Sequence, residues 1–305
     1  MRGLRIFSLF FLLYLPAAFA NKEIPIWPDE VSANNKFINF SKNPAINNRA
    51  VTHVDAPQMI YVPATGKNNH AAVLIIPGGG FSYIMKDLEG LDVANVLSQQ
   101  GYASFVLIYR LPHDGSAQYR QQAFADTQRA LRLIRANAQQ YQVAPDRIGV
   151  MGFSAGAFLA ANLSNTPDEA NYQAVDAQDK VSARPDFSAL IYPVLSLKQG
   201  VTHPGTRAAL YGKDLSAQQM AQLSQEDRIS AHTPPTFLVQ ALNDGTASPQ
   251  NALGMFSALR QNKVNVELHL FQQGGHGFGT GQKQHLPVQN WLTLFHAWQS
   301  SLAKR

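Results

Sequence analysis

The chain has 305 residues, of which 45% are hydrophobic and 15% charged, enough for a sizeable core in one large domain or two small ones. It contains no cysteine, which excludes disulfides, thiolate metal sites and a cysteine nucleophile. The formal net charge is +5, but the basic residues are scattered and form no Lys/Arg cluster, so nucleic-acid binding is not expected.

The first twenty residues have the pattern of a secretory signal peptide. Arg2 and Arg5 form a basic start, residues 6–15 are apolar, and Ala18-Phe19-Ala20 supplies a small-residue cleavage site. The apolar run is short for a bilayer-spanning helix, so an N-terminal membrane anchor is the weaker alternative. We therefore expect cleavage after Ala20 and an exported protein, periplasmic or secreted, without stable membrane insertion.

The rest of the chain alternates between strand and helix patterns. Residues 21–56 are rich in Asn and Pro, and we interpret them as an extended arm that wraps the domain. This alternation predicts an α/β fold in one domain over residues 21–305, with a mainly parallel sheet covered by helices on both faces. Residues 194–234 interrupt it, and we expect them to form a small cap. Strands are predicted at 59–63, 71–76, 104–109, 148–151, 187–192, 236–242 and 266–271, and helices at 88–100, 116–140, 157–163, 249–261 and 287–302.

A glycine loop, Pro77-Gly78-Gly79-Gly80-Phe81, follows the predicted strand at 71–76. Glycine lets a backbone amide approach a substrate without a Cβ in the way, so Gly79 and Gly80 are candidate donors to an oxyanion. A phosphate-binding loop is the alternative. The loop lacks the Lys-Ser/Thr pair of a P-loop and the spacing of a dinucleotide site, which disfavours that alternative.

The pentapeptide Gly152-Phe153-Ser154-Ala155-Gly156 lies between a predicted strand and a predicted helix. Gly-x-Ser-x-Gly in that position is the nucleophile elbow of serine hydrolases, where side chains flanking the tight turn would clash. We therefore predict Ser154 as the nucleophile. The backbone N–H of Ala155 is a third candidate oxyanion donor.

A serine hydroxyl needs a base to take its proton and an acid to orient that base. His276, within Gly274–Gly279 after the last predicted strand, is the candidate base. Asp244 follows the preceding strand and is the candidate acid, although Asn-Asp-Gly is also an ordinary turn sequence. Asp186 is the alternative acid. No metal or organic cofactor is required by this chemistry.

Three further side chains are candidate walls of the substrate pocket, namely Tyr83, His203 and Phe278. Simple packing is the alternative explanation for each of them.

With these motifs the chain resembles the α/β-hydrolase superfamily, and more narrowly the bacterial xylan esterase or feruloyl esterase-like branch, near the hormone-sensitive-lipase-type esterases. The resemblance extends along nearly all of residues 21–305. Two departures stand out: Pro77 replaces the histidine of a His-Gly-Gly-Gly loop, and Asn243-Asp244 replaces an Asp-Asp pair. Other shared segments are Ile24-Pro25-Ile26-Trp27-Pro28, Tyr109-Arg110-Leu111-Pro112, Tyr192-Pro193-Val194 and Pro234-Pro235-Thr236-Phe237-Leu238.

The resemblance implies a serine ester hydrolase that removes acetyl or similar small acyl groups from sugar hydroxyls, on oligosaccharide or plant polysaccharide. One alternative is a serine peptidase of the prolyl-oligopeptidase type, which usually carries an additional propeller domain. The other is a non-catalytic binding protein on the same fold, which usually lacks a member of the triad. Relatives are sometimes labelled xylanases, but no motif here identifies the two carboxylates that a glycosidase needs.

Overall fold

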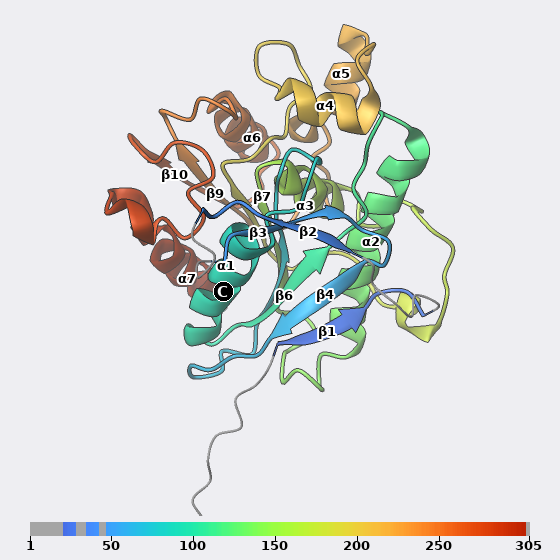
Figure 1. The fold of residues 1–305 in the computed structure, drawn as a ribbon, viewed down its shortest axis with the longest axis vertical. Coiled ribbons are helices and arrows are strands. Elements are labelled where there is room, and N and C mark those ends of the chain that lie inside the picture. The colour runs from blue at the N-terminus through green and yellow to red at the C-terminus, as the bar shows by residue number, and fades with distance from the viewer. Residues whose placement is uncertain (1–20, 29–34, 43–46, 303–305) are drawn as a thin grey trace, which may run out of the picture.

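The computed structural model describes residues 21–28, 35–42 and 47–302. The signal-peptide prediction for residues 1–20 lies outside them. An eight-stranded sheet with the order β1-β4-β6-β5-β7-β8-β9-β10 forms the centre of the molecule (Figure 1). The strands are β1 Lys22–Pro25, β4 Gln58–Val62, β5 Ala72–Ile76, β6 Ala103–Ile108, β7 Ile148–Phe153, β8 Ser188–Ile191, β9 Thr236–Ala241 and β10 Val266–Phe271.

The predicted mainly parallel sheet is confirmed. All neighbours from β6 to β10 pair in parallel, whereas β4 pairs antiparallel with both β1 and β6. Every residue of β5, β6, β7, β8 and β9 is buried, as expected for strands covered on both faces. These continuous apolar runs are what made the strands recognisable in the sequence.

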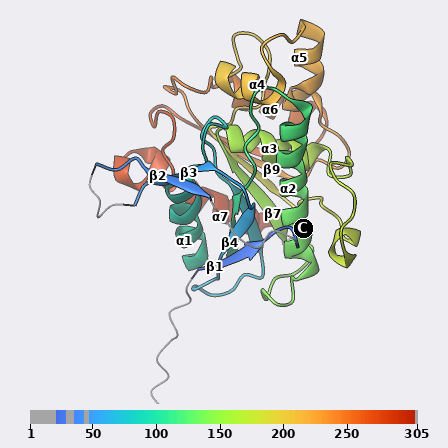
Figure 2. The same cartoon turned by 45° about the vertical axis from the view of Figure 1, so that its right-hand side comes forward.

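Helices cover both faces of the sheet. Figure 2 shows α1 and α7 on one side and α2 and α3 on the other. Ser116 caps the N-terminus of α2, where its side chain accepts a hydrogen bond from the backbone N–H of Tyr119. The α-helices around the sheet are α1 Asp92–Gln99, α2 Ala117–Ala136, α3 Ala155–Asn165, α6 Gln250–Gln261 and α7 Trp291–Leu302. A π-helical turn over Lys86–Leu91 precedes α1. Short 3₁₀ turns lie at Ala177–Lys180, Gln225–Asp227, Gln282–Gln284 and Pro287–Asn290.

The N-terminal arm has more regular structure than its sequence suggested. β1 pairs with β4 and thereby extends the central sheet. β2 Lys36–Asn39 and β3 Arg49–His53 form a separate two-stranded sheet. All residues of β2 are exposed, and its sequence, Lys-Phe-Ile-Asn, does not alternate between apolar and polar residues as a half-buried strand does.

Residues 194–234 contain α4 Pro204–Tyr211 and α5 Ala217–Leu223. Figure 1 shows both helices at the end of the molecule toward which the parallel strands point. In doubly wound α/β folds, loops at the carboxyl ends of the strands build the ligand site. That these residues act as a cap stays a prediction.

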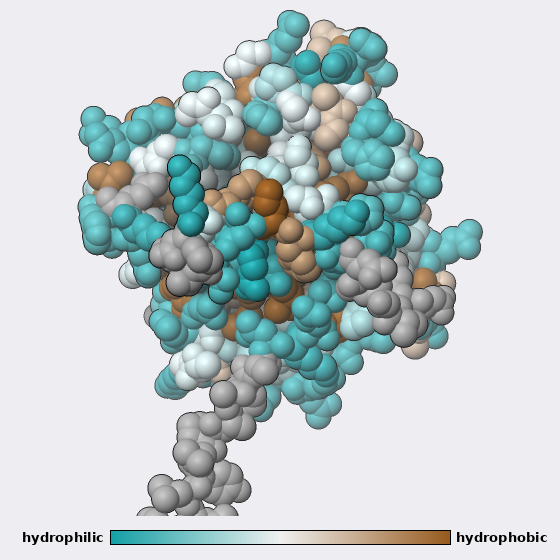
Figure 3. Space-filling model, in the orientation of Figure 1, coloured by the Kyte–Doolittle hydropathy of each residue, from teal (hydrophilic) through white to brown (hydrophobic). Residues whose placement is uncertain are grey.

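The surface is largely hydrophilic, with some hydrophobic atoms near the middle of the face in Figure 3. The exposed apolar side chains include Phe37, Ile38 and Phe40, which lie on or directly after β2. Among the helices of the described ranges, none combines the length and apolar character needed to span a bilayer.

Candidate active site

Ser154 occupies a strained turn between β7 and α3. Its backbone has φ 49° and ψ −120°, a conformation that residues other than glycine rarely adopt. A Cβ on Gly156 would lie 2.2 Å from the carbonyl oxygen of Ile76, and one on Gly152 would lie 2.6 Å from the Cα of Ala157. Both flanking positions therefore require glycine, as the nucleophile-elbow interpretation predicts.

The structure brings together three predicted side chains from loops that follow three different strands. The Oγ of Ser154 lies 2.8 Å from Nε2 of His276. The Nδ1 of His276 lies 2.8 Å from Oδ2 of Asp244. Ser154 is 7% exposed and Asp244 8% exposed, so little water reaches the interacting atoms. The three groups form a Ser-His-Asp chain of hydrogen bonds.

Asp186, the alternative acid, lies elsewhere. Its Oδ2 accepts hydrogen bonds from Nη2 of Arg135 and from the backbone N–H of Ile148, each at 2.9 Å. This carboxylate thus connects α2 to the start of β7 and makes no contact with His276. The geometry favours Asp244 over Asp186 as the partner of the imidazole.

The surroundings of Asp244 hold its carboxylate in the charged form. Burial by itself raises the pKa of Asp244, but the hydrogen bond and charge of His276 and two backbone amides outweigh it, so this pKa lies below its ordinary value. The amides are those of Thr246 and Ala247, which donate to Oδ1 at 2.8 and 2.9 Å. An ionised Asp244 can only accept, which assigns the proton to Nδ1 of His276 and leaves Nε2 free to accept from Ser154.

Asn243 connects the loop of the acid to the loop of the base. Its Oδ1 accepts hydrogen bonds from the backbone N–H groups of Gly274 and Gly275, at 3.1 and 2.9 Å. These amides lie directly before His276. The asparagine that departs from the Asp-Asp pair therefore positions the histidine loop, a function that its sequence context did not reveal.

The glycine loop after β5 has the backbone conformation that only glycine tolerates well. Gly79 has φ 129° and Gly80 has φ 62°. A Cβ on Gly79 would lie 2.1 Å from the carbonyl oxygen of Tyr83. Within the described residues, the amides of Gly79 and Gly80 have no hydrogen-bond acceptor. Ala155 is the first residue of α3, where helical amides lack an acceptor within the helix.

Glu89 is a buried carboxylate beneath this site that the sequence analysis missed. Its Oε2 accepts from the N–H of Gly78 at 2.6 Å, and its Oε1 accepts from the hydroxyl of Tyr192 at 3.0 Å. The ring of Tyr192 in turn lies 5.0 Å from the ring of His276. Glu89 therefore holds both the glycine loop and the aromatic ring that supports the base.

The pKa of Glu89 reflects this position. Burial raises the pKa, and the hydrogen bonds from Gly78 and Tyr192 oppose that shift without cancelling it. In the sequence, Glu89 lies between charged and helix-forming residues and has the pattern of an exposed position. Only the packing of the π-helical turn against β3, β5 and β6 places it in the interior.

A cavity of about 350 Å³ opens above Ser154. Tyr83 and His203, two of the three predicted pocket residues, line it. Phe278 does not, because its side chain is buried and packs against Tyr192 with ring centroids 4.4 Å apart. The positive φ angles of Gly277 and Gly279 turn the backbone on either side of it.

His203 enters the cavity from the segment before α4. Its Nδ1 accepts a hydrogen bond from the backbone N–H of Thr206 at 3.2 Å, which places the remaining ring proton on Nε2. Burial lowers the pKa of His203, and the nearby charge of His276 lowers it further. His203 is therefore a neutral side chain. In the described part of the chain, no group of three His, Asp or Glu side chains is arranged to hold a metal ion.

Comparison with known proteins places this geometry in a family. A sequence model of the BD-FAE family matches residues 59–259, about two thirds of the chain. The chain belongs to the BD-FAE family. The matched range contains the glycine loop, Ser154 and Asp244, and it ends before His276. The esterase-like resemblance predicted from the sequence is thus confirmed.

Two curated relatives share about a third of their aligned residues with this BD-FAE member. An acetylxylan esterase of Xylanibacter ruminicola is 32% identical over 215 residues, covering 69% of this chain and 41% of the relative. The endo-1,4-beta-xylanase B of Butyrivibrio fibrisolvens is 31% identical over 205 residues, covering 67% of this chain and 32% of the relative. The chain therefore spans less than half the length of either relative.

Solved structures confirm the α/β-hydrolase fold. The acetyl ester-xyloside bifunctional hydrolase of Caldicellulosiruptor lactoaceticus is 30% identical with a TM-score of 0.75, covering 92% of this chain and 96% of its own. The carboxylesterase Cest-2923 of Lactobacillus plantarum is 20% identical with a TM-score of 0.67, covering 90% and 98%, a likeness of fold alone. These relatives support the predicted enzyme class, a serine-type esterase.

Proposed function

We propose that this protein is a carboxylic ester hydrolase that works through Ser154, His276 and Asp244. The observation that carries the proposal is the unbroken chain of two 2.8 Å hydrogen bonds that joins these side chains, with Ser154 held on a strained turn. A serine so placed has its proton acceptor within reach before any substrate arrives.

In the proposed reaction, the Oγ of Ser154 attacks the ester carbonyl carbon while Nε2 of His276 takes the hydroxyl proton. Asp244 keeps the imidazole in the required tautomer and stabilises its positive charge. The tetrahedral intermediate collapses, the C–O bond to the alcohol breaks, and His276 returns its proton to the leaving alcohol. Water, deprotonated by His276, then attacks the acyl carbon. The bond from that carbon to Oγ breaks as His276 returns its proton to Ser154, and the carboxylic acid is released.

The developing negative charge on the carbonyl oxygen also needs donors. We assign this role to the backbone N–H groups of Gly79, Gly80 and Ala155. The lack of an acceptor for the two glycine amides in the described residues supports the assignment. Removing one such donor from an oxyanion hole typically costs about 2.7–4 kcal/mol of transition-state stabilisation.

The proposed substrate is a sugar hydroxyl esterified with acetate or a similarly small acyl group. The cavity of about 350 Å³ is at the lower end of the range for ligand pockets, which suits a short acyl chain. The neutral ring of His203 lies beside Gly80 and offers Nε2–H to an alcohol oxygen. The names of the similar acetylxylan esterase and acetyl ester-xyloside bifunctional hydrolase agree with this substrate class.

The protein is exported, because residues 1–20 have the pattern of a signal peptide.

Cleavage of glycosidic bonds is not proposed for this cavity, because Glu89 is the only carboxylate among its described lining residues and both its oxygens are already engaged.

Hydrolysis of p-nitrophenyl acetate and of acetylated xylo-oligosaccharides tests the proposal. The wild-type protein should hydrolyse both, and Ser154→Ala should lose activity on both. Ser257→Ala, which changes an exposed serine on α6, is the matched control and should keep full activity. Rapid cleavage of a proline-containing peptide amide with negligible ester hydrolysis would instead identify a peptidase.

A further inference from the structure

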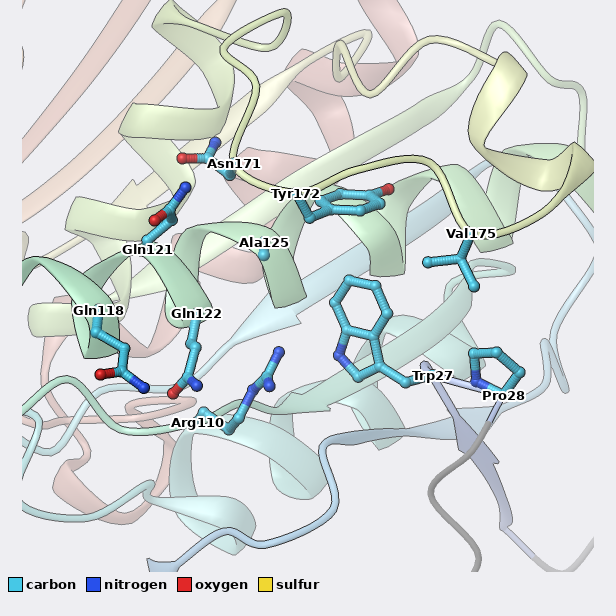
Figure 4. Close-up of a pocket in the computed structure, with 10 residues that line it drawn as sticks. All are labelled: Trp27, Pro28, Arg110, Gln118, Gln121, Gln122, Ala125, Asn171, Tyr172 and Val175. Carbon is cyan, nitrogen blue, oxygen red and sulfur yellow. The ribbon is translucent and has the colours of Figure 1, made fainter.

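A second cavity, of about 490 Å³, lies between the N-terminal arm and α2, and it shares no lining residue with the cavity at Ser154. Figure 4 shows Trp27, Pro28, Tyr172 and Val175 gathered at one end of it, with Ala125 of α2 beside the two aromatic rings. Three segments distant in sequence therefore build a pocket that the proposed triad does not use.

The aromatic walls of this pocket are held in place. Nε1 of Trp27 donates to Oδ1 of the buried Asp126 at 2.8 Å, and the indole meets the ring of Tyr172 edge-on with centroids 5.0 Å apart. The hydroxyl of Tyr172 donates to Asp179 at 2.5 Å and accepts from Arg132 at 2.7 Å. Rings fixed in this way lose little conformational entropy when a ligand packs against them.

The polar part of the pocket is made of amides. Gln118, Gln121 and Gln122 lie on the α2 side, and within the described residues their side chains have no hydrogen-bond partner. Each amide offers donors as well as an acceptor. Of the described lining residues only Arg110 is charged, and its Nε lies 3.0 Å from the buried carboxylate of Asp126, so the pocket favours a neutral ligand.

We propose that this pocket binds a sugar unit of a neutral oligosaccharide. A pyranose ring has apolar C–H faces, which pack against indole and phenol rings, and hydroxyls at its edge, which pair with amides. Rigid aromatic surface together with unpartnered amide groups matches both features of such a ring. A charged sugar would find no opposite charge that is not already compensated.

A third cavity lies next to both this pocket and the cavity at Ser154. Its volume is about 570 Å³, and it shares Arg110 and Gln122 with the pocket at Trp27. It also shares Ser82 with the cavity at Ser154. From this adjacency we expect an oligosaccharide of several units to lie along the three cavities with an ester at Ser154. This link rests on the proposed function, whereas binding in the Trp27 pocket does not.

Binding of unesterified sugars tests the inference without any hydrolysis. Xylohexaose and cellohexaose are titrated into the full chain carrying Ser154→Ala while tryptophan fluorescence is recorded. Trp27 is half-buried, whereas Trp291 and Trp298 are buried, so the signal reports chiefly on Trp27. We expect a saturable change with at least one hexaose, and the comparison shows which sugar is preferred.

Two variants in this background locate the binding site. Val175→Arg places a long side chain at an exposed wall position, and the double variant Gln118→Ala/Gln121→Ala removes two amides from the exposed face of α2. Each should weaken hexaose binding by about two- to ten-fold. Gln139→Ala, an exposed glutamine outside the three cavities, is the control and should bind as the parent does.

An activity ratio then tests the connection to Ser154. In otherwise wild-type protein, both pocket variants should lower the ratio of kcat/KM for acetylated xylohexaose to that for p-nitrophenyl acetate by about two- to ten-fold. No binding of either hexaose, or equal binding by both variants and the parent, would overturn the inference. Hexaose binding without p-nitrophenyl acetate hydrolysis would contradict only the proposed function.

Discussion

Replacing Asp244 with asparagine keeps the shape of the side chain and removes its charge. Two backbone amides, those of Thr246 and Ala247, donate to Oδ1, so the amide oxygen of the asparagine must stay on that side. The amide NH₂ then takes the place of Oδ2, 2.8 Å from Nδ1 of His276. Because this NH₂ can only donate, the imidazole is forced into the tautomer with its proton on Nε2, which cannot accept the proton of Ser154.

The expected cost follows from the tautomer. Loss of the correct tautomer in a serine triad lowers kcat by about 10⁴-fold, and we expect Asp244→Asn to lower it by about 10³- to 10⁴-fold. The new NH₂ also faces Nε2 of Gln240, which donates to Oδ2 at 3.0 Å in the wild type. Two donors facing each other in a buried site should destabilise the fold by about 1–3 kcal/mol.

The assay is the rate of p-nitrophenyl acetate hydrolysis under saturating conditions, with urea unfolding to confirm that the variant is folded. Asp186→Asn is the matched control, because Asp186 is also an aspartate that accepts from a backbone N–H, but it contacts Arg135 and Ile148 instead of a histidine. It should lose some stability and keep kcat within about two-fold. Retained activity in Asp244→Asn, or loss only in Asp186→Asn, would refute the reasoning.

Three other changes test separate parts of the structure. The pKa of Glu89 is higher in the folded protein than in the unfolded chain, so the stability that Glu89 contributes is lost as the pH rises above about 4, and Glu89→Gln lacks this pH-dependent contribution. Urea unfolding from pH 4 to 7 should therefore show the difference in unfolding free energy between wild type and variant shifting in favour of the variant, and a difference that stays constant with pH would contradict this. Asn243→Ala removes the acceptor of two amides before His276 and should reduce kcat about ten-fold in the p-nitrophenyl acetate assay, with unchanged kcat speaking against a positioning role. Gly156→Ala would place a Cβ 2.2 Å from a backbone oxygen and should destabilise the protein by about 3 kcal/mol or more in thermal unfolding. Gly245→Ala is the control, because a Cβ added there has no atom within 4 Å, and it should be neutral. Equal melting temperatures of the two variants would disprove the steric argument.

The parts of the fold predictable from the sequence depend on local patterns. Buried parallel strands appear as continuous apolar runs, and β5 and β7 are such runs. The nucleophile elbow is a turn whose steric demands fall on Gly152, Ser154 and Gly156 themselves. Asp244 and His276 were predicted from their places directly after two successive strands, and because parallel strands end at one edge of the sheet, these loops lie close together.

The remaining features depend on contacts between distant segments, which a single sequence does not display. Glutamate is a residue type expected at the surface, and only tertiary packing makes Glu89 a buried anchor for Gly78 and Tyr192. Phe278 was expected to face the substrate, but the glycines beside it turn its ring inward. The exposed strand β2 has no periodic apolar pattern to recognise.

The central claim, that Ser154 is an activated nucleophile, is tested most directly by covalent labelling. The full chain is treated with a fluorophosphonate probe, which reacts with activated serines, and the modified residue is identified by peptide mass spectrometry. The account predicts one adduct per chain, located on Ser154 and absent from Ser154→Ala. An unlabelled protein, or an adduct on another residue that persists in Ser154→Ala, would contradict it.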